Sequence, residues 1–460
     1  MNQPPADTAD SYYLAHQKIY PRDVRGRFAR LRNIAVLVLL GLFYFMPWLS
    51  MAGRQAVLFD LPARKFYIFA LVLWPQDFIY LTALLVLAAL SLFFFTALAG
   101  RLWCGYACPQ TVWTEAFLWM ERMTEGDRAA RMRLDRSPWS ASKVMRKGAK
   151  QTLWILFALW TGFTFVGYFT PIRTLGAEIF SNSLGPWEIF WILFYGFATY
   201  GNAGFLREQV CKYMCPYARF QSAMFDRDTL IITYDAKRGE PRGARRRGTD
   251  PAQLGLGDCV DCTWCVQVCP TGIDIRKGLQ YECIACAACI DACDAVMDRV
   301  GYPRGLVRYT TQHALDGKKT HVMRPRVLIY ASLLGVIALA LLIAVLTRDP
   351  LHLDVIRDRN TLYRMLDNGD AENVYTLKIV NKTQQDHEFA IDVAGSGKLR
   401  LTVAGQTHMV RSGEVRAIPV RVARPAYEPQ GSENIEFTVR AVDQSDLRAR
   451  HTARFLAPTQ

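Results

Sequence analysis

Five long stretches of almost uncharged, apolar residues constrain the fold of this chain more than any other feature. They are Ile34–Met51, Phe78–Ala99, Thr152–Thr170, Ile189–Leu206 and Val327–Thr347. The hydrocarbon core of a bilayer is about 30 Å thick, and a helix of ~20 apolar residues crosses it. A further run, Phe66–Trp74, is too short to cross and is expected to be re-entrant or interfacial. The sequence therefore predicts an α-helical membrane protein with five transmembrane helices, four within residues 34–206 and the fifth at 327–347.

The distribution of Lys and Arg predicts how these helices are oriented. The 460-residue chain holds 55 Lys and Arg against 41 Asp and Glu. By count, the leader (1–33) has 6 of these basic residues, the second loop (101–151) has 10, the third (171–188) has 1 and the fourth (207–326) has 19. Because basic loops stay on the cytoplasmic side, we expect the leader and the fourth loop in the cytoplasm and residues 348–460 in the periplasm. No basic motif in a soluble domain points to a nucleic-acid partner.

The fourth loop carries the most specific chemical signal, because it holds eight of the twelve cysteines. They form two copies of the pattern C-x2-C-x2-C-x3-C. This is the spacing of bacterial two-cluster ferredoxins, in which the fourth cysteine of each motif binds the other cluster. The spacing therefore predicts one [4Fe–4S] cluster on Cys259, Cys262, Cys265 and Cys293, and a second on Cys283, Cys286, Cys289 and Cys269. A zinc site would need only four thiolates, and a reducing compartment disfavours disulfides.

The remaining four cysteines form two copies of C-x-x-x-C-P, each directly after a predicted span. One copy holds Cys104 and Cys108, and the other holds Cys211 and Cys215. Residues four apart lie on one face of a helix, and both spans are expected to run toward the cytoplasm. Four thiols at one depth can therefore form a shared site, although a buried cysteine is often a small packing residue. Soft thiolates favour Cu(I), zinc or an iron–sulfur cluster.

The tail at 348–460 has a different character. Segments such as "NVYTLKIV", "EFAIDV" and "IEFTVRAV" alternate apolar and polar residues between turns. This pattern predicts an immunoglobulin-like β-sandwich. The tail has no cysteine, so a structural or partner-docking role is expected. Its histidines, His352, His387, His408 and His451, are expected at the surface.

Several longer stretches together resemble the cytochrome c oxidase accessory protein family, called CcoG, FixG or RdxA. They include "GRLWCGYACPQTVWTEAFLWMER", "CKYMCPYARFQSAMFD" and "GDCVDCTWCVQVCPTGIDIRKGLQYECIACAACIDACD". The ferredoxin motif alone is shared by many proteins, but its combination with two C-x-x-x-C-P segments and a β-sandwich tail is specific. In the second ferredoxin motif Asp294 stands where the first has Pro270, which removes no ligand.

The resemblance implies a multi-pass protein of the bacterial inner membrane that reduces Cu(II) to Cu(I) for assembly of cbb3-type cytochrome c oxidase. It implies that Cys104, Cys108, Cys211 and Cys215 form the copper-binding, catalytic site, and that the eight loop cysteines bind the two [4Fe–4S] clusters. Expected partners are a copper exporter or chaperone and the assembly factors of the oxidase. The sequence does not identify the electron donor, and a homo-oligomer is compatible with it.

Two other functions are compatible with the same sequence. A quinol dehydrogenase, similar to the membrane partner of periplasmic nitrate reductase, would pass electrons from quinol to a redox partner. A non-enzymatic scaffold would hold oxidase assembly factors through its β-sandwich. Eight cluster ligands are difficult to explain in a scaffold.

Overall fold

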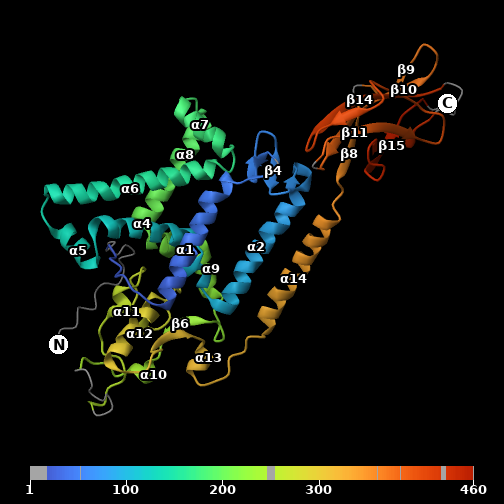
Figure 1. Cartoon of the computed structure of the whole chain (residues 1–460). Coiled ribbons are helices and arrows are strands. Elements are labelled where there is room, and N and C mark those ends of the chain that lie inside the picture. The colour runs from blue at the N-terminus through green and yellow to red at the C-terminus, as the bar shows by residue number, and fades with distance from the viewer. Residues whose placement is uncertain are drawn as a thin grey trace, which may run out of the picture. The chain divides into compact units, whose positions relative to one another are not determined.

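Two separate units make up the chain in the computed structural model (Figure 1). They are Met1–Leu339 and Ala340–Gln460. The structure describes residues 18–51, 53–245, 254–359, 361–383, 385–425 and 431–458. Residues 1–17 of the expected leader therefore lie outside the described part.

Four helices in the described part are long and apolar enough to cross a membrane. They are α1 (Arg27–Phe45, continued by η1, Met46–Trp48), α2 (Phe78–Ala99), α8 (Pro186–Thr199, continued by η3, Tyr200–Leu206) and α14 (Pro325–Leu346). The apolar windows of α2 and α14 have mean hydropathies of 2.5 and 2.7 and are 0% and 6% buried. Such faces suit lipid. α2 coincides with the expected span, and α8 with η3 and α14 match theirs within three residues.

The count of five is not confirmed, because the expected span Thr152–Thr170 is only part of a longer helix, α6 (Ala141–Val166). The first half of α6 is basic, and its Lys147 and Lys150 pair with buried Glu125 at 3.1 and 2.8 Å. At ~1.5 Å per residue, the apolar part from Thr152 to Val166 is only about 22 Å long. Ion pairs with α4 (Pro109–Glu125) thus hold one end of α6 in a polar setting.

Two other boundaries also differ from expectation. α1 begins at Arg27, so it takes in the last residues of the predicted leader and ends before Met51. The run Phe66–Trp74 forms strands β4 (Lys65–Ile68) and β5 (Leu71–Leu73), which continue an antiparallel sheet from β3 (Val57–Asp60). This short apolar segment therefore pairs its backbone groups within a sheet, rather than forming a re-entrant or interfacial segment.

The cysteine-rich region folds beside the cytoplasmic ends that were expected for α1 and α2. Strands β6 (Ile231–Tyr234) and β7 (Val307–Thr310) pair antiparallel and enclose α11 (Trp264–Gln267) and α12 (Ala288–Val300) between them in sequence. Two hydrogen bonds dock α1 on this region, because Asp291 of α12 accepts from the backbone N–H groups of Phe28 (3.2 Å) and Ala29 (2.7 Å). They satisfy amides that the first turn of a helix leaves unpaired.

The second unit is the β-sandwich that the alternating pattern predicted. One sheet has the order β12-β14-β10-β8 with β9 beside β10, and the other has the order β13-β11-β15-β16. Their bounds are β8 Leu351–Arg357, β9 Arg364–Met365, β10 Ala371–Asn381, β11 His387–Ala394, β12 Arg400–Val403, β13 His408–Val410, β14 Val415–Arg424, β15 Glu433–Ala441 and β16 Arg448–Phe455. Tyr375, Phe389, Phe437 and Phe455 fill the core between the sheets.

The prediction that the histidines of this unit lie at the surface is wrong at two positions. His352 is exposed, but His387 and His408 are buried. The Nδ1 atom of His387 lies 2.7 Å from the Asp443 carboxylate, which satisfies the buried ring. Desolvation lowers the pKa of His408, so this ring favours its neutral form.

Candidate functional site

The eight cysteines of the fourth loop line two adjacent cavities. One is lined by Cys259, Cys262, Cys265 and Cys293. The other is lined by Cys269, Cys283, Cys286 and Cys289, with Cys265 shared between the two. Each cavity thus collects three thiols from one motif and the last thiol of the other. This is the grouping that the predicted crossed ligation requires. Which cysteine binds which cluster stays a prediction.

The backbone of the two motifs repeats around these cavities. Asp261 and Ala285 each precede the second cysteine of a motif, and their φ angles are 52° and 53°. Thr263 and Ala287 each follow that cysteine, with φ angles of 58° and 59°. This left-handed conformation costs about 1–2 kcal/mol for a residue with a Cβ atom. Its recurrence at equivalent positions shows that both loops are wound tightly around the enclosed space.

The chemistry of these residues fits two [4Fe–4S] clusters. Burial raises the pKa of Cys265, Cys283 and Cys293 to about 12, so a bound metal centre is needed to hold them as thiolates. Among the described residues, no three of the eight sulfur atoms all lie within 4.8 Å of one another. One zinc ion with Zn–S bonds of ~2.3 Å would have to draw these thiols closer together. A four-iron cluster binds each thiolate at a separate iron atom and suits the wider spacing.

The two C-x-x-x-C-P segments do not form regular helices, which corrects the expectation that helical spacing aligns their thiols. Cys104 lies in the short α3 (Leu102–Tyr106), whereas Cys108 is extended (φ −61°, ψ 128°) and precedes α4. Cys211 lies in the π-turn η4 (Val210–Met214), and Cys215 is again extended (φ −80°, ψ 107°) before α9 (Pro216–Ala223). The cause is local, because a proline pushes the preceding residue out of the helical region.

The four thiols of these segments still lie near enough to influence one another electrostatically. We call them the membrane-boundary thiols: Cys104, Cys108, Cys211 and Cys215. Burial raises the pKa of Cys104 to about 12, and the neighbouring Cys108 and Cys211 raise it further. Burial also raises the pKa of Cys211 to about 11, with further contributions from Cys108 and Cys215. The Cys104 thiol donates to Gln221 Oε1 at 3.2 Å. In the described chain, however, no three of these sulfur atoms lie within 4.8 Å of one another, so a single ion would have to draw them together.

Gly105, inside the first C-x-x-x-C-P segment, brings this thiol group against the second ferredoxin motif. A Cβ atom at Gly105 would lie 2.7 Å from the Ile284 carbonyl oxygen and 2.8 Å from that of Ala285. Cys104 accordingly packs in one apolar cluster with Ile284 and Cys286. The glycine therefore permits a close backbone approach that any side chain would block. Sequence reasoning missed this residue, although its place between two cysteines was a signal.

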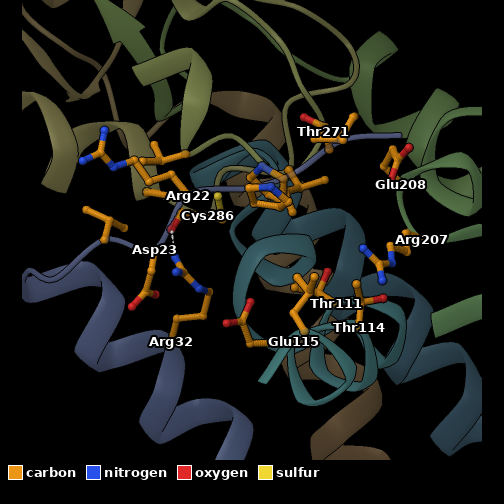
Figure 2. A pocket seen from close by; sticks show the side chains of 18 of the residues that line it. Arg22, Asp23, Arg32, Thr111, Thr114, Glu115, Arg207, Glu208, Thr271 and Cys286 are labelled. Carbon is orange, nitrogen blue, oxygen red and sulfur yellow. Dashed lines mark hydrogen bonds between the residues drawn. The ribbon is translucent and has the colours of Figure 1, made fainter. Parts of the chain in front are cut away.

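A cavity also joins the two cysteine groups. Cys211 of the membrane-boundary thiols and Cys286 of the second motif both line it. Figure 2 shows Arg32 and Cys286 on one side of the cavity and Arg207 and Glu208 on the other, with Glu115 below. Arg32 of α1 donates from Nη1 to the Cys286 carbonyl oxygen at 3.0 Å. The cavity is therefore a chamber between the two sets of thiols, with several charged side chains in a mostly apolar wall.

Ion pairs brace the helices around this chamber. Glu121 is fully buried and accepts from Arg131 at 3.2 Å and from Arg207 at 2.8 Å. Glu115 pairs with Arg122 at 3.2 Å. The arginines lower the pKa of Glu121 against the effect of burial, so it stays ionised. These carboxylates hold α4, α5 (Arg128–Arg136) and η3 together, which is a structural role.

Comparison with known proteins agrees with this arrangement. Family models match a 4Fe–4S dicluster domain at residues 206–312, a 4Fe–4S binding domain at 81–123, and the immunoglobulin-like fold at the C-terminus of FixG at 341–458. The chain is 39% identical over 447 residues to nitrogen fixation protein FixG of Rhizobium meliloti, covering 89% of this chain and 84% of that protein. It is 42% identical over 419 residues to protein RdxB of Cereibacter sphaeroides, covering 88% and 87%.

A solved structure is also similar over part of the chain. The crystal structure of a FixG-related protein from Vibrio parahaemolyticus is 34% identical and covers 24% of this chain and 97% of that one, with a TM-score of 0.22. Together, the apolar helices, the two cysteine motifs and the sandwich define a membrane-bound iron–sulfur protein of electron transfer. Within that class, the chain belongs to the FixG/RdxA family.

Proposed function

We propose that this chain is a metal reductase of the inner membrane that converts Cu(II) to Cu(I) for the assembly of a cbb3-type cytochrome c oxidase. Each Cu²⁺ ion takes up one electron. When bound, the [4Fe–4S] clusters would supply one-electron transfer from a reduced cytoplasmic donor protein. The substrate ion would be held at Cys104, Cys108, Cys211 and Cys215, because soft thiolates stabilise Cu(I) over Cu(II).

One observation carries this proposal: the close approach of Gly105 to Ile284 and Ala285. It puts Cys104 in contact with the loop that lines the second cluster cavity. On this proposal, the site for the reducible ion and the site for the electron carrier share one packed interface. The chamber lined by Cys211 and Cys286 would be the route for the substrate ion.

The residues around the thiols have distinct tasks in this proposal. Gln221 accepts the thiol hydrogen of Cys104 and is itself fixed, because its Nε2 donates to Thr96 Oγ1 at 3.3 Å. Arg101 donates to the carbonyl oxygens of Tyr281 and Ala218, so it ties the thiol segment to both neighbours. The extended backbone at Cys108 and Cys215 leaves these two residues at the N-termini of α4 and α9.

The function can be tested by titration of the anaerobically purified, full-length protein. After reduction and removal of excess reductant, added CuCl₂ should reoxidise the clusters with about one electron per ion. A Cu(I)-specific chelator should then trap the product. Clusters that stay reduced with Cu²⁺ present, but are reoxidised by ferricyanide, would refute cupric reduction.

The topology is part of the proposal. The leader and residues 207–326 would face the cytoplasm, and residues 348–460 the periplasm, where the sandwich could dock a copper exporter, a chaperone or oxidase assembly factors. The contrast between 10 basic residues in 101–151 and 1 in 171–188 supports this. Alkaline phosphatase fused after Gln460 should be active, and fused after Gly239 it should be inactive. The reverse pattern would contradict the orientation.

Quinol oxidation is a second candidate, and the chamber favours it. Its mostly apolar wall, which carries a few charged side chains, is of the kind that small-molecule sites show. Reduction of the clusters by a quinol analogue would support this candidate. Reoxidation by Cu²⁺ without any response to quinol would favour the cupric reductase.

A further inference from the structure

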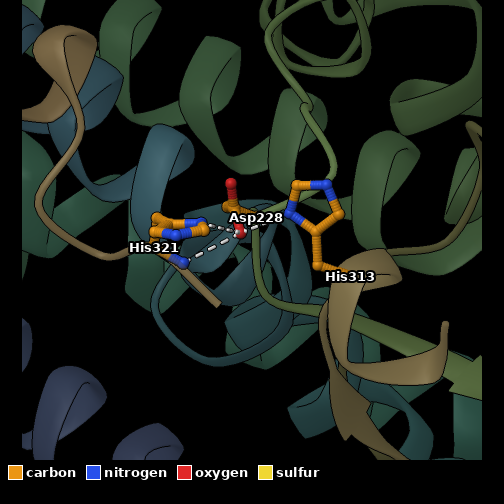
Figure 3. Close-up of side chains that lie close together, drawn as sticks. All are labelled: Asp228, His313 and His321. Carbon is orange, nitrogen blue, oxygen red and sulfur yellow. Dashed lines mark hydrogen bonds and ion pairs between the residues drawn. The ribbon is translucent and has the colours of Figure 1, made fainter. Parts of the chain in front are cut away.

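A cluster of two histidines and one carboxylate lies outside both cysteine sites. Asp228, His313 and His321 bring one ligand atom each to within 4.8 Å of one another, and no other such group occurs in the described residues (Figure 3). The Asp228 Oδ1 atom lies 2.8 Å from His313 Nδ1 and 4.0 Å from His321 Nδ1. The three residues come from separate segments: the loop before β6, α13 (Gln312–Leu315) and the loop before α14.

Backbone contacts hold the three segments in this arrangement. The N–H of His321 donates to Asp228 Oδ1 at 3.0 Å, and the N–H of His313 donates to the Arg227 carbonyl oxygen at 3.1 Å. Thr311 and Thr320 share a hydroxyl hydrogen bond of 2.7 Å that closes the loop between the two histidines. The ligands are therefore positioned by the fold before any ion binds.

The chemistry of the group suits a divalent transition metal. Ligand bonds of ~2.0–2.1 Å put two adjacent ligand atoms about 3 Å apart, close to the Asp228–His313 distance. The side chain of His321 is 69% exposed, which leaves an entry path for an ion. Imidazole and carboxylate accept Cu²⁺ and Zn²⁺, whereas thiolates prefer Cu(I).

The position of the group relates it to the membrane-boundary thiols. Thr229, next to Asp228, donates to the carbonyl oxygen of Ala97 in the last turn of α2 at 3.1 Å. Gln221, which binds the Cys104 thiol, contacts Thr96 in that same turn. The histidine group and the thiol group thus lie against one turn of one helix.

We propose that Asp228, His313 and His321 form a binding site for Cu²⁺, with the two imidazoles and the carboxylate as ligands. Binding at this site requires no redox step. Its use as the loading site from which Cu²⁺ reaches the thiols rests on the proposed cupric reductase function. A chain with both sites would offer nitrogen and oxygen ligands to the oxidised ion and sulfur ligands to the reduced one.

The test uses full-length protein with oxidised clusters, which give no EPR signal, and the Cys104→Ser/Cys211→Ser background, in which the thiol site is disabled. One equivalent of CuCl₂ should give a Cu²⁺ signal with hyperfine splitting from two nitrogens. In that background, His321→Ala and His313→Gln should each weaken Cu²⁺ binding by at least about tenfold, the loss typical when even an outer partner of a ligand is removed. His352→Ala, an exposed histidine of the other unit, is the matched control.

Zinc gives a second readout that is independent of redox chemistry. Zn²⁺ bound after dialysis should fall in His321→Ala and stay unchanged in His352→Ala. Equal Cu²⁺ and Zn²⁺ binding in all three histidine variants would overturn the site. Because neither measurement needs reduction, failure of cupric reductase activity alone would leave this binding result intact.

Discussion

The ferredoxin motifs and the membrane-boundary pairs present the same ligand atom on two different backbones. In the ferredoxin motifs, left-handed residues such as Thr263 and Ala287 wrap short loops around enclosed cavities. In the pairs, the helix breaks at Cys108 and Cys215, and Cys211 lines the chamber between the two cysteine groups. On the proposed function, the ferredoxin motifs hold permanent cofactors, whereas the membrane-boundary pairs hold an ion that is exchanged.

The largest expected effect comes from breaking the crossed ligation of the permanent sites. Cys293→Ser should remove about half of the iron and acid-labile sulfide, because one of two clusters is lost. The EPR spectrum of the reduced variant should match that of Cys259→Ser, whose cysteine belongs to the first motif. A spectrum that matches Cys283→Ser would show that Cys293 serves its own motif, and the crossing would be wrong.

A smaller structural change is expected from separating the two regions without removing a ligand. Gly105→Ala would put a Cβ atom 2.7 Å from the Ile284 carbonyl oxygen, so α3 has to move away from the cluster loop. Displacements near 1 Å can cost about 10²-fold in rate, and we expect cupric reduction to fall at least about tenfold with iron content unchanged. Stopped-flow reoxidation by CuCl₂ measures this rate.

The matched control for that variant has the smallest expected effect. Gly148 lies on the exposed side of α6, and a Cβ atom at this position would meet no other atom within 4 Å, so Gly148→Ala should leave the rate unchanged. It should raise stability by up to about 1 kcal/mol, the helix preference of alanine over glycine, seen as a slightly higher unfolding temperature. Equal rates for Gly105→Ala and Gly148→Ala would show that the close approach at Gly105 does not control the rate of cupric reduction.

Much of this organisation follows from local sequence signals. Apolar length alone gives α2 at its observed bounds, and alternation gives the sandwich strands. The Cys–Pro dipeptides also indicate where the helices break, although the four-residue spacing of the cysteines suggested continuous helices. The start of α1 could not be predicted, because the carboxylate that caps it, Asp291, is far away in sequence.

Long-range packing decides the other features that were not predicted. Glu125 draws the basic half of α6 into ion pairs, so this helix does not resemble an ordinary span. Asp228 meets His313 and His321 only because β6 and β7 pair and bring their flanking loops together. A sequence pattern reports neighbours along the chain, and these contacts join segments with no common pattern.

The central claim is that the membrane-boundary thiols receive the ion that the clusters reduce. The most direct test is anaerobic mixing of reduced Cys104→Ser/Cys211→Ser protein with CuCl₂, with cluster absorbance and trapped Cu(I) followed together. The account predicts unchanged iron and sulfide content, slow cluster reoxidation and little Cu(I). Reoxidation and Cu(I) yield equal to those of the unsubstituted protein would contradict it.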